Sequence, residues 1–254
     1  MELHYKDYGS GEPLLILHGV FGMSDNWHTI AKILSEYYWV IVPDLRNHGR
    51  SGHSEELNYD VMSGDILQLI EKLHIRKCNI IGHSMGGKLV MNFALEYPEY
   101  IDKMMVLEIG VKQYSGNHEF ILEALNKINP ANYNDRRKIE MQLLEYIPNI
   151  RIVNFLMKNI KLNSDNTSYE WKFNLKAISE NYNQLLSSIN SDHGYLGEAL
   201  FVKGGNSDYI LEYDWKDILE LFPNAQLHTI ASAGHWIHAD KQQELVNEIK
   251  NFLK

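Results

Sequence analysis

Short apolar runs recur at both ends of the chain, and each has the length of a strand. They lie at 14–17, 39–42, 78–81, 103–107, 200–202 and 226–230. Most are apolar throughout rather than alternating with polar residues, which is typical of strands buried on both faces of a sheet. The pattern therefore predicts a mostly parallel sheet.

Helical spacing fills the intervals between these runs. Apolar side chains recur every three or four residues from 62 to 73, from 89 to 97 and from 245 to 253. Pro98 ends the second of these patterns, as expected where a helix stops. Strands that alternate with helices predict a doubly wound α/β fold, in which helices cover both faces of the sheet.

The middle of the chain lacks this alternation. It has helical periodicity and no convincing strand, and two apolar sets stand out: Ile121, Leu125 and Ile128, then Phe155, Leu156 and Ile160. A helical segment that interrupts an alternating pattern is typical of a cap laid over a sheet. We predict a core formed by residues 1–110 and 198–254, with a helical cap, or lid, inserted at 111–197.

One serine lies in a Gly-x-Ser-x-Gly motif, Gly82-His83-Ser84-Met85-Gly86, between a predicted strand and a predicted helix. On such a sharp turn, side chains two residues either side of the serine would collide, and glycines remove those collisions. The following helix directs its positive N-terminal end toward negative charge that develops at the serine. We predict that Ser84 is a catalytic nucleophile.

A serine hydroxyl is a poor nucleophile until a base takes its proton. Folds that carry this motif place serine, acid and histidine in that order along the chain. His235, in Ser232-Ala233-Gly234-His235-Trp236, follows the last predicted strand and fits the position of the base. His238 is the nearby alternative, but it falls where the next helix begins. His83 precedes the nucleophile, and we expect it to point away from Ser84.

Negative charge in the transition state also needs hydrogen-bond donors. The segment Leu17-His18-Gly19-Val20-Phe21-Gly22 leaves a predicted strand through a His-Gly turn, which suits an oxyanion loop. We expect the donors to be the backbone N–H groups of Val20 and Met85, with Phe21 as an alternative to Val20. The side chain of His18 is expected to brace the loop rather than react.

Four motifs together resemble those of α/β-hydrolase esterases, in the same order along the chain. They are His18-Gly19-Val20-Phe21-Gly22, the segment from Asp44 to Ser51, Gly82 to Gly87, and Gly234-His235-Trp236. The whole chain is similar to YbfF-type bacterial esterases and their mitochondrial abhydrolase relatives. This resemblance implies an α/β-hydrolase fold and hydrolysis of short-chain carboxylic esters or thioesters, acyl-CoA included. We expect Phe21 and Trp236 to line the substrate pocket.

The acid that should orient His235 has two candidates. Most members of the fold carry it after the strand near Val202, in a Gly-x-x-Asp loop, where this chain offers Ser207 or Asp208, depending on which glycine starts the loop. YbfF-type relatives instead resemble a rearranged triad, with the acid after an earlier strand and a serine in the later loop. The resemblance then implies Glu108 as the acid.

That earlier position departs from the relatives. They usually show an aspartate followed by a proline, where this chain has Glu108 and Gly110. The longer glutamate can still fix the imidazole tautomer and stabilise the imidazolium, provided that its carboxylate reaches the ring N–H. We expect Glu108 as the acid with Ser207 in support. The alternative is Asp208 as the acid, with Glu108 forming a salt bridge at the cap hinge.

Composition narrows the possible partners and compartments. A net charge of −9, spread along the chain, disfavours binding to nucleic acid. A single cysteine excludes an internal disulfide. The N-terminus is polar, and no apolar run approaches the ~18 residues of a membrane span. We expect a cytoplasmic protein that acts on a small-molecule ester, has no membrane span, and is of unknown oligomeric state.

Other functions remain open for the same residues. Several histidines are candidate metal ligands, but their spacing matches no metal motif, so we expect neither metal nor cofactor. A carbon–carbon lyase or a perhydrolase could use the same triad, and Arg46 is the obvious arginine for binding a carboxylate in the lyase. A non-catalytic ligand receptor on this scaffold is a further alternative. Arg46 and His48 lie in a loop near the site, which more often has a structural role.

Overall fold

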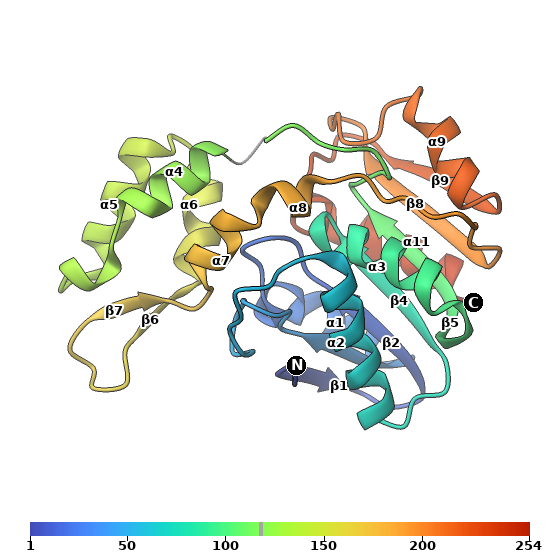
Figure 1. Ribbon diagram of the computed structural model, residues 1–254, viewed down its shortest axis with the longest axis horizontal. Helices are drawn as coiled ribbons and strands as arrows, with labels where there is room; N and C mark the ends of the chain where they lie inside the picture. Colours follow the sequence, from blue (N-terminus) through green and yellow to red (C-terminus); the bar gives the residue numbers. More distant parts are fainter. Residues whose placement is uncertain (117–118) are drawn as a thin grey trace.

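A seven-stranded sheet forms the centre of the protein, in a computed structural model that describes residues 1–116 and 119–254 (Figure 1). The strand order is β1-β3-β2-β4-β5-β8-β9; every neighbouring pair is parallel except β1 and β3. The predicted mostly parallel sheet is therefore confirmed. The strands are β1 (Tyr5–Tyr8), β2 (Glu12–Leu17), β3 (Tyr38–Pro43), β4 (Cys78–His83), β5 (Ile101–Leu107), β8 (Glu198–Gly204) and β9 (Ala225–Ile230).

The unpredicted strand β1 lies at the edge of the sheet. Its sequence, Tyr5-Lys6-Asp7-Tyr8, carries no apolar run, and none of its residues is fully buried. It pairs antiparallel with β3 through backbone hydrogen bonds, which any side chain permits. A search for apolar runs finds strands whose side chains are buried, so it does not detect an exposed edge strand such as β1.

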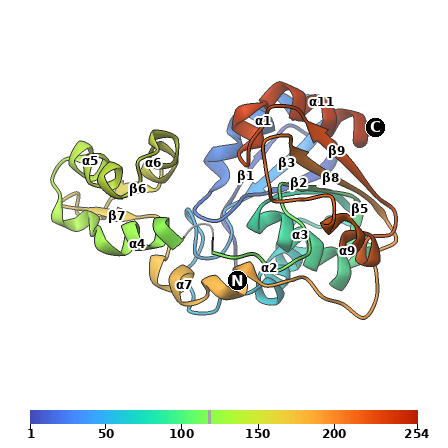
Figure 2. The same ribbon diagram turned by 90° about the horizontal axis from the view of Figure 1, so that it is seen from above.

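Helices cover both faces of the sheet (Figure 2). One face carries α1 (His28–Leu34) and α11 (Gln242–Phe252); the other carries α2 (Tyr59–Lys72), α3 (Met85–Glu96) and α9 (Asp214–Leu221). Along β2, Leu15 and Leu17 pack into one core while Leu14 and Ile16 pack into the other, and all four are fully buried. Burial on both faces explains why the strand sequences are apolar throughout.

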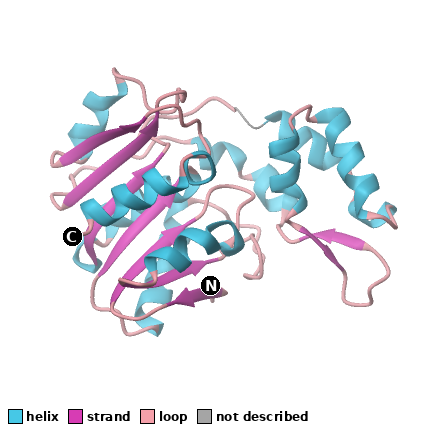
Figure 3. Ribbon diagram, turned by 180° about the vertical axis from the view of Figure 1, so that it is seen from behind, coloured by secondary structure: helices cyan, strands magenta, loops and turns pink. Residues whose placement is uncertain are grey.

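The segment between β5 and β8, called the insertion below (residues 111–197), stands to one side of the sheet (Figure 3). Its outer part comprises three helices and a hairpin, and two further helices lead back toward β8 (Figure 1). The elements are α4 (Glu119–Lys127), α5 (Arg136–Tyr146), α6 (Ile150–Met157), β6 (Ile160–Leu162), β7 (Tyr169–Trp171), α7 (Leu175–Glu180) and α8 (Tyr182–Leu186).

The hairpin corrects the expectation that this segment holds no strand. Helix α6 ends at Met157, so Ile160 belongs to β6 and not to the helical set of Phe155 and Leu156. The strands β6 and β7 pair antiparallel over three residues each. Of these residues only Ile160 is fully buried, so the hairpin is too short and too exposed to produce an apolar run.

A buried lysine joins the insertion to the core helix α3. The Nζ of Lys88 donates to the carbonyl oxygens of Val111 (3.2 Å), Lys112 (2.6 Å) and Ser187 (2.6 Å). Val111 and Lys112 begin the insertion and Ser187 lies near its end. One ammonium group therefore binds both segments that connect the insertion to the core. Burial lowers the pKa of Lys88 to about 7, because removal from water disfavours the charged form.

None of the helices in the described ranges combines the length and apolar content needed to cross a membrane. The longest of them, α2, has 14 residues, whereas a transmembrane helix needs about 20. The remaining short elements are single helical turns, η1 (Ser24–Trp27), η2 (Pro98–Tyr100), η3 (Pro130–Asn132) and α10 (Ile237–Asp240).

Candidate active site

Ser84 lies on the turn between β4 and α3. Its backbone has φ 53° and ψ −117°, an unusual conformation for a residue with a side chain. Two hydrogen bonds hold it there: the Ser84 N–H donates to the carbonyl of Leu107 (2.9 Å), and its carbonyl accepts from the N–H of Lys88 (3.0 Å). Strain of this kind persists only where the surrounding structure enforces it, and it is typical of functional sites.

The two glycines of the motif leave no room for a side chain. A Cβ at Gly82 would lie 2.1 Å from the carbonyl oxygen of Gly86, and a Cβ at Gly86 would lie 2.4 Å from that of Leu17. Both contacts are with backbone atoms, which cannot rotate aside. Close packing of β2, β4 and α3 therefore requires glycine at both positions.

His235 lies in the loop between β9 and α10, and it lines the same cavity as Ser84. The ring of Tyr209 stacks on the imidazole, with 3.8 Å between ring centroids and 17° between planes. The neighbouring His238 lines this cavity too, stacked on Trp27 at 4.9 Å. Burial holds the pKa of His238 well below its usual value, so its ring is neutral.

His83 does not point away from the site, contrary to our expectation. It lines the cavity that holds Ser84 and His235, and its Nε2 donates to the carbonyl oxygen of His235 (2.8 Å). Its ring centroid is 4.9 Å from that of His235. The residue before Ser84 thus anchors the loop that carries His235.

Glu108 directly follows β5 and is the carboxylate that meets His235. Its Oε2 lies 3.4 Å from the imidazole Nδ1, and its side chain is fully buried. The Ser207 hydroxyl donates to Oε2 and the Gly204 N–H donates to Oε1. Burial raises the pKa of Glu108 to about 7, and these two hydrogen bonds oppose the shift.

Asp208, the alternative acid, is exposed to solvent. It borders an outward-facing hollow that Lys112, Asn206 and the edge of His235 also line. The structure therefore brings Glu108 and Ser207 to His235 and leaves Asp208 at the surface. Glu108 reaches the ring with a φ of 61°, a left-handed backbone that turns the chain sharply after the strand.

The loop after β2, called the oxyanion loop below (His18–Gly22), packs against the serine turn. A Cβ at Gly19 would lie 3.4 Å from the Cβ of Ser84. The Gly22 N–H donates to the Gly19 carbonyl (2.9 Å), which closes a turn with Val20 and Phe21 at its centre. Within the described ranges, the N–H groups of Val20 and Met85 have no protein acceptor, so both are available to an oxyanion.

His18 braces this loop. Its Nε2 accepts from the N–H of Leu45 (3.0 Å), so Nδ1 carries the proton and donates to the Gly19 carbonyl (2.8 Å). Burial lowers the pKa of His18, which keeps the ring neutral in this arrangement. The side chain thus joins two loops of the core and has no hydrogen available for a reaction at Ser84.

Two cavities meet at Ser84 and Val20, with empty volumes of about 500 and 420 Å³. Both have largely apolar walls, to which the insertion contributes. The first is lined by Phe21, Trp27, Ile121, Phe155 and Trp236, among others, and the second by Met85, Ile109, Tyr182, Leu185 and Leu186. Both Phe21 and Trp236, predicted as pocket residues, border the first cavity.

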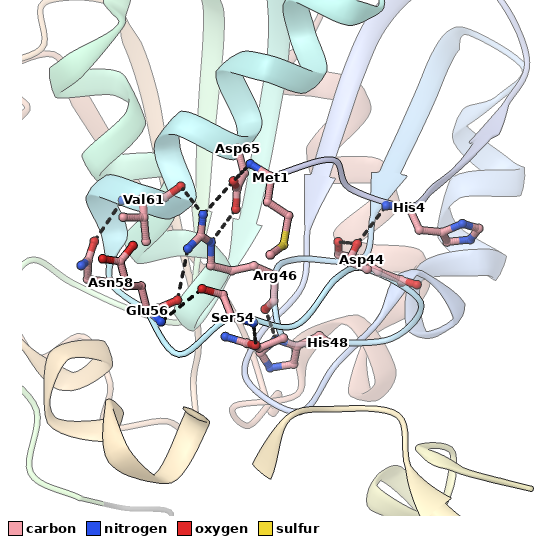
Figure 4. Close-up of polar contacts among 12 residues, drawn as sticks. Met1, His4, Asp44, Arg46, His48, Ser54, Glu56, Asn58, Val61 and Asp65 are labelled. Atoms are coloured by element: carbon pink, nitrogen blue, oxygen red, sulfur yellow. Dashed lines mark hydrogen bonds and ion pairs between the residues drawn. The ribbon is translucent and has the colours of Figure 1, made fainter. Parts of the chain in front are cut away.

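Arg46 and His48 belong to a structural network instead of the cavity walls (Figure 4). The Arg46 guanidinium binds both carboxylate oxygens of Asp65, at 2.6 and 2.8 Å, and the carbonyls of Glu56 and Val61, both at 3.1 Å. His48 Nδ1 donates to the carbonyl of Arg46 (2.8 Å). Arg46 is therefore committed elsewhere, and the described walls of both cavities carry no arginine that could bind a carboxylate.

Two residues that sequence reasoning missed contact the imidazole of His235 or its loop. Tyr209 stacks on the ring and His83 bonds to the backbone. In the sequence, the only indication of these contacts is that Tyr209 lies close to Ser207 and His83 lies next to Ser84. The contacts themselves join loops that follow β4, β8 and β9, and these loops meet only because the carboxyl ends of parallel strands share one edge.

Comparisons with known proteins agree with this geometry. A family model for the alpha/beta hydrolase fold matches residues 12–242. The chain is 38% identical to an sn-1-specific diacylglycerol lipase, ABHD11, of Danio rerio, over 97% of this chain and 80% of that protein. It is 32% identical to Esterase YbfF of Escherichia coli, over 96% of this chain and 94% of that one.

Among solved structures, a marine microorganism esterase superposes with a TM-score of 0.97, at 40% identity over 99% of both chains. Identities of this size over nearly the whole length, together with the Gly-x-Ser-x-Gly turn, establish the relationship. The chain therefore belongs to the α/β-hydrolase family and is a carboxylesterase within it.

Proposed function

We propose that this carboxylesterase works through an acyl-enzyme on Ser84, with His235 as the general base and Glu108 as the acid that orients it. One observation carries the assignment of the acid: the buried Glu108 carboxylate contacts Nδ1 of the imidazole whose loop lines the Ser84 cavity. A carboxylate at Nδ1 fixes the tautomer that leaves Nε2 free to accept a proton. Ser207 supports the carboxylate through its hydroxyl.

In the first half-reaction, the Ser84 hydroxyl oxygen attacks the ester carbonyl and His235 takes the hydroxyl proton. The carbonyl oxygen becomes an oxyanion, which accepts hydrogen bonds from the N–H groups of Val20 and Met85; one such donor is worth about 3–4 kcal/mol. His235 then returns the proton to the departing alcohol. Water repeats the sequence on the acyl-enzyme and releases the carboxylic acid.

The insertion serves as the cap of this site in the same proposal. It supplies Ile121 and Phe155 to one cavity and Tyr182, Leu185 and Leu186 to the other. With Ser84 at the junction, one cavity suits an acyl chain and the other an apolar leaving group. Short acyl chains are the proposed substrates, as the resemblance to YbfF-type esterases implies.

A substrate panel tests this preference. We expect p-nitrophenyl esters of two to six carbons to be hydrolysed with kcat/KM at least about tenfold above esters of twelve or more, because a longer chain must displace packed side chains of the cavity walls, at a cost of about 1–3 kcal/mol. Thioesters of the same acyl groups, acyl-CoA included, and a diacylglycerol complete the panel. A preference for the long chains or for the diacylglycerol would contradict the short-chain proposal.

The pH dependence of activity and stability should run in opposite directions. Glu108 must be ionised to stabilise the imidazolium, so kcat/KM should fall as the pH drops through about 7, the raised pKa of this group. Because the folded protein holds this proton between pH 4.5 and about 7, the contribution of Glu108 to stability is present at low pH and is lost as the pH rises through that window.

Chemical denaturation at pH 5 and pH 8 measures the second effect. The free energy of unfolding of the wild type, relative to Glu108→Gln, should fall by up to about 3 kcal/mol between these values. Asp208→Asn retains Glu108 and is the control: relative to Glu108→Gln, its free energy of unfolding should fall as much as that of the wild type. A wild type that gains stability over Glu108→Gln at pH 8 would contradict the direction of the shift.

A further inference from the structure

One side chain of the insertion contacts the backbone of the oxyanion loop directly. The amide nitrogen of Asn159 donates to the carbonyl oxygen of Phe21 (2.8 Å), across 138 residues of sequence. Asn159 is fully buried. The remaining groups on its amide make no other protein hydrogen bond in the described part of the chain. The hydrogen bond to Phe21 therefore joins the Asn159 side chain to the core.

The backbone of Asn159 is held on both sides. It lies between α6 and β6, where its N–H donates to the carbonyl of Leu156 (2.9 Å) and its carbonyl accepts from the N–H of Lys172 (2.8 Å). Lys172 in turn bonds through its Nζ to the carbonyl of Lys158 (2.9 Å). These bonds place the amide at a defined position above the loop.

Phe21 needs such support because its backbone is strained. It has a φ of 59°, whereas Val20 is absent from the left-handed region, so the turn from Gly19 to Gly22 has the pattern of a type II turn. That turn normally carries glycine or asparagine at its third position. Here a bulky aromatic residue occupies it, and its ring packs against Phe173 of the insertion at 5.2 Å.

We infer that Asn159 is a positioning residue, which keeps the oxyanion loop in its turn and so aims the Val20 N–H at the reacting carbonyl. The inference rests on the proposed role of that N–H. The insertion is then more than a wall of the cavities, because it shapes the backbone that stabilises the transition state. A shift of the turn would weaken binding of the oxyanion while leaving ground-state binding of the ester largely intact.

Asn159→Leu and Asn159→Asp test this inference. Leucine removes the donor at similar volume, and aspartate directs a carboxylate at the Phe21 carbonyl. We expect kcat for p-nitrophenyl butyrate to fall about 10- to 100-fold in both variants, with KM changed less than about twofold. The affinity for an aryl trifluoromethyl ketone, whose adduct with Ser84 carries an oxyanion, should fall in parallel with kcat.

Asn181→Leu is the matched control. The Asn181 amide also donates from the insertion to a core carbonyl, that of Glu55 (2.9 Å), but it lies outside both cavities. Its kcat and its ketone affinity should equal those of the wild type. Titration with a fluorophosphonate counts the reactive Ser84 sites in each preparation. Because kcat is calculated per titrated site, a loss of folded protein does not lower it.

Wild-type kcat and ketone affinity in the Asn159 variants would overturn the inference, as would an equal loss in Asn181→Leu or a rise in KM at constant kcat. These results leave the proposed function intact as long as Ser84→Ala is inactive. If Ser84→Ala retains turnover, the proposed mechanism itself fails, and the two failures are thereby distinguished.

Discussion

Replacing Ser84 with alanine is expected to lower kcat for p-nitrophenyl butyrate by about five to six orders of magnitude. The change removes the only atom that attacks the carbonyl in the proposed mechanism, while the oxyanion donors and the cavities stay in place. Binding of the ester should therefore survive, with a dissociation constant close to that of the wild type. Stopped-flow turnover and equilibrium binding of a slowly hydrolysed ester measure the two quantities separately.

The backbone at this position provides a second readout. Ser84 has a φ of 53°, and a non-glycine residue held in such a region costs about 1–3 kcal/mol. Alanine keeps that cost and glycine removes most of it, so Ser84→Gly should be as inactive as Ser84→Ala but more stable in thermal denaturation. Thermal denaturation also shows whether each Ser84 variant is folded. A loss of activity in a folded variant then cannot be attributed to unfolding.

Ser164→Ala is the control, because Ser164 is exposed in the loop between β6 and β7, far along the chain from the site. Its turnover should be that of the wild type. Unchanged turnover in Ser84→Ala would contradict the acyl-enzyme proposal. Labelling of Ser84 by a fluorophosphonate, without hydrolysis of any ester in the panel, would point to the ligand receptor instead.

Glu108→Gln is expected to lower kcat by about three to four orders of magnitude, by analogy with the loss of the acid in other serine triads. The amide cannot stabilise the imidazolium, and it allows the wrong imidazole tautomer. Asp208→Asn should keep wild-type activity, because Asp208 is exposed to solvent whereas the buried Glu108 is the carboxylate at Nδ1 of His235. Steady-state kinetics on the two variants, side by side, decide between the two candidate acids.

Glu108→Asp separates the charge of this residue from its reach. It restores the carboxylate but withdraws it by one methylene from an imidazole that is already 3.4 Å away. We expect activity between those of Glu108→Gln and the wild type, because a carboxylate at longer range still favours the charged imidazole. Loss of activity in Asp208→Asn alone would show that Glu108 is not the acid.

Much of the fold was predictable because its determinants are local. Strands such as β2 and β4 are apolar throughout, since both of their faces are buried, and the helices between them repeat at helical spacing. The turn that carries Ser84 was equally predictable, because the backbone around Gly82 and Gly86 leaves no space for a Cβ and so requires glycine at both positions. The edge strand β1 and the hairpin of β6 and β7 were missed, because exposed strands carry no apolar signature.

The sequence by itself determined the buried strands of the sheet and the position of Ser84 on its turn, and it made His235 the predicted base by its place after the last strand. The tertiary structure decided which carboxylate meets His235, that Arg46 is bound to Asp65, and that Asn159 reaches Phe21. The physical reason lies in the range of the interactions. Steric limits and burial patterns act between near neighbours in sequence, whereas a buried polar group finds its partner only after distant loops have met at the edge of the sheet.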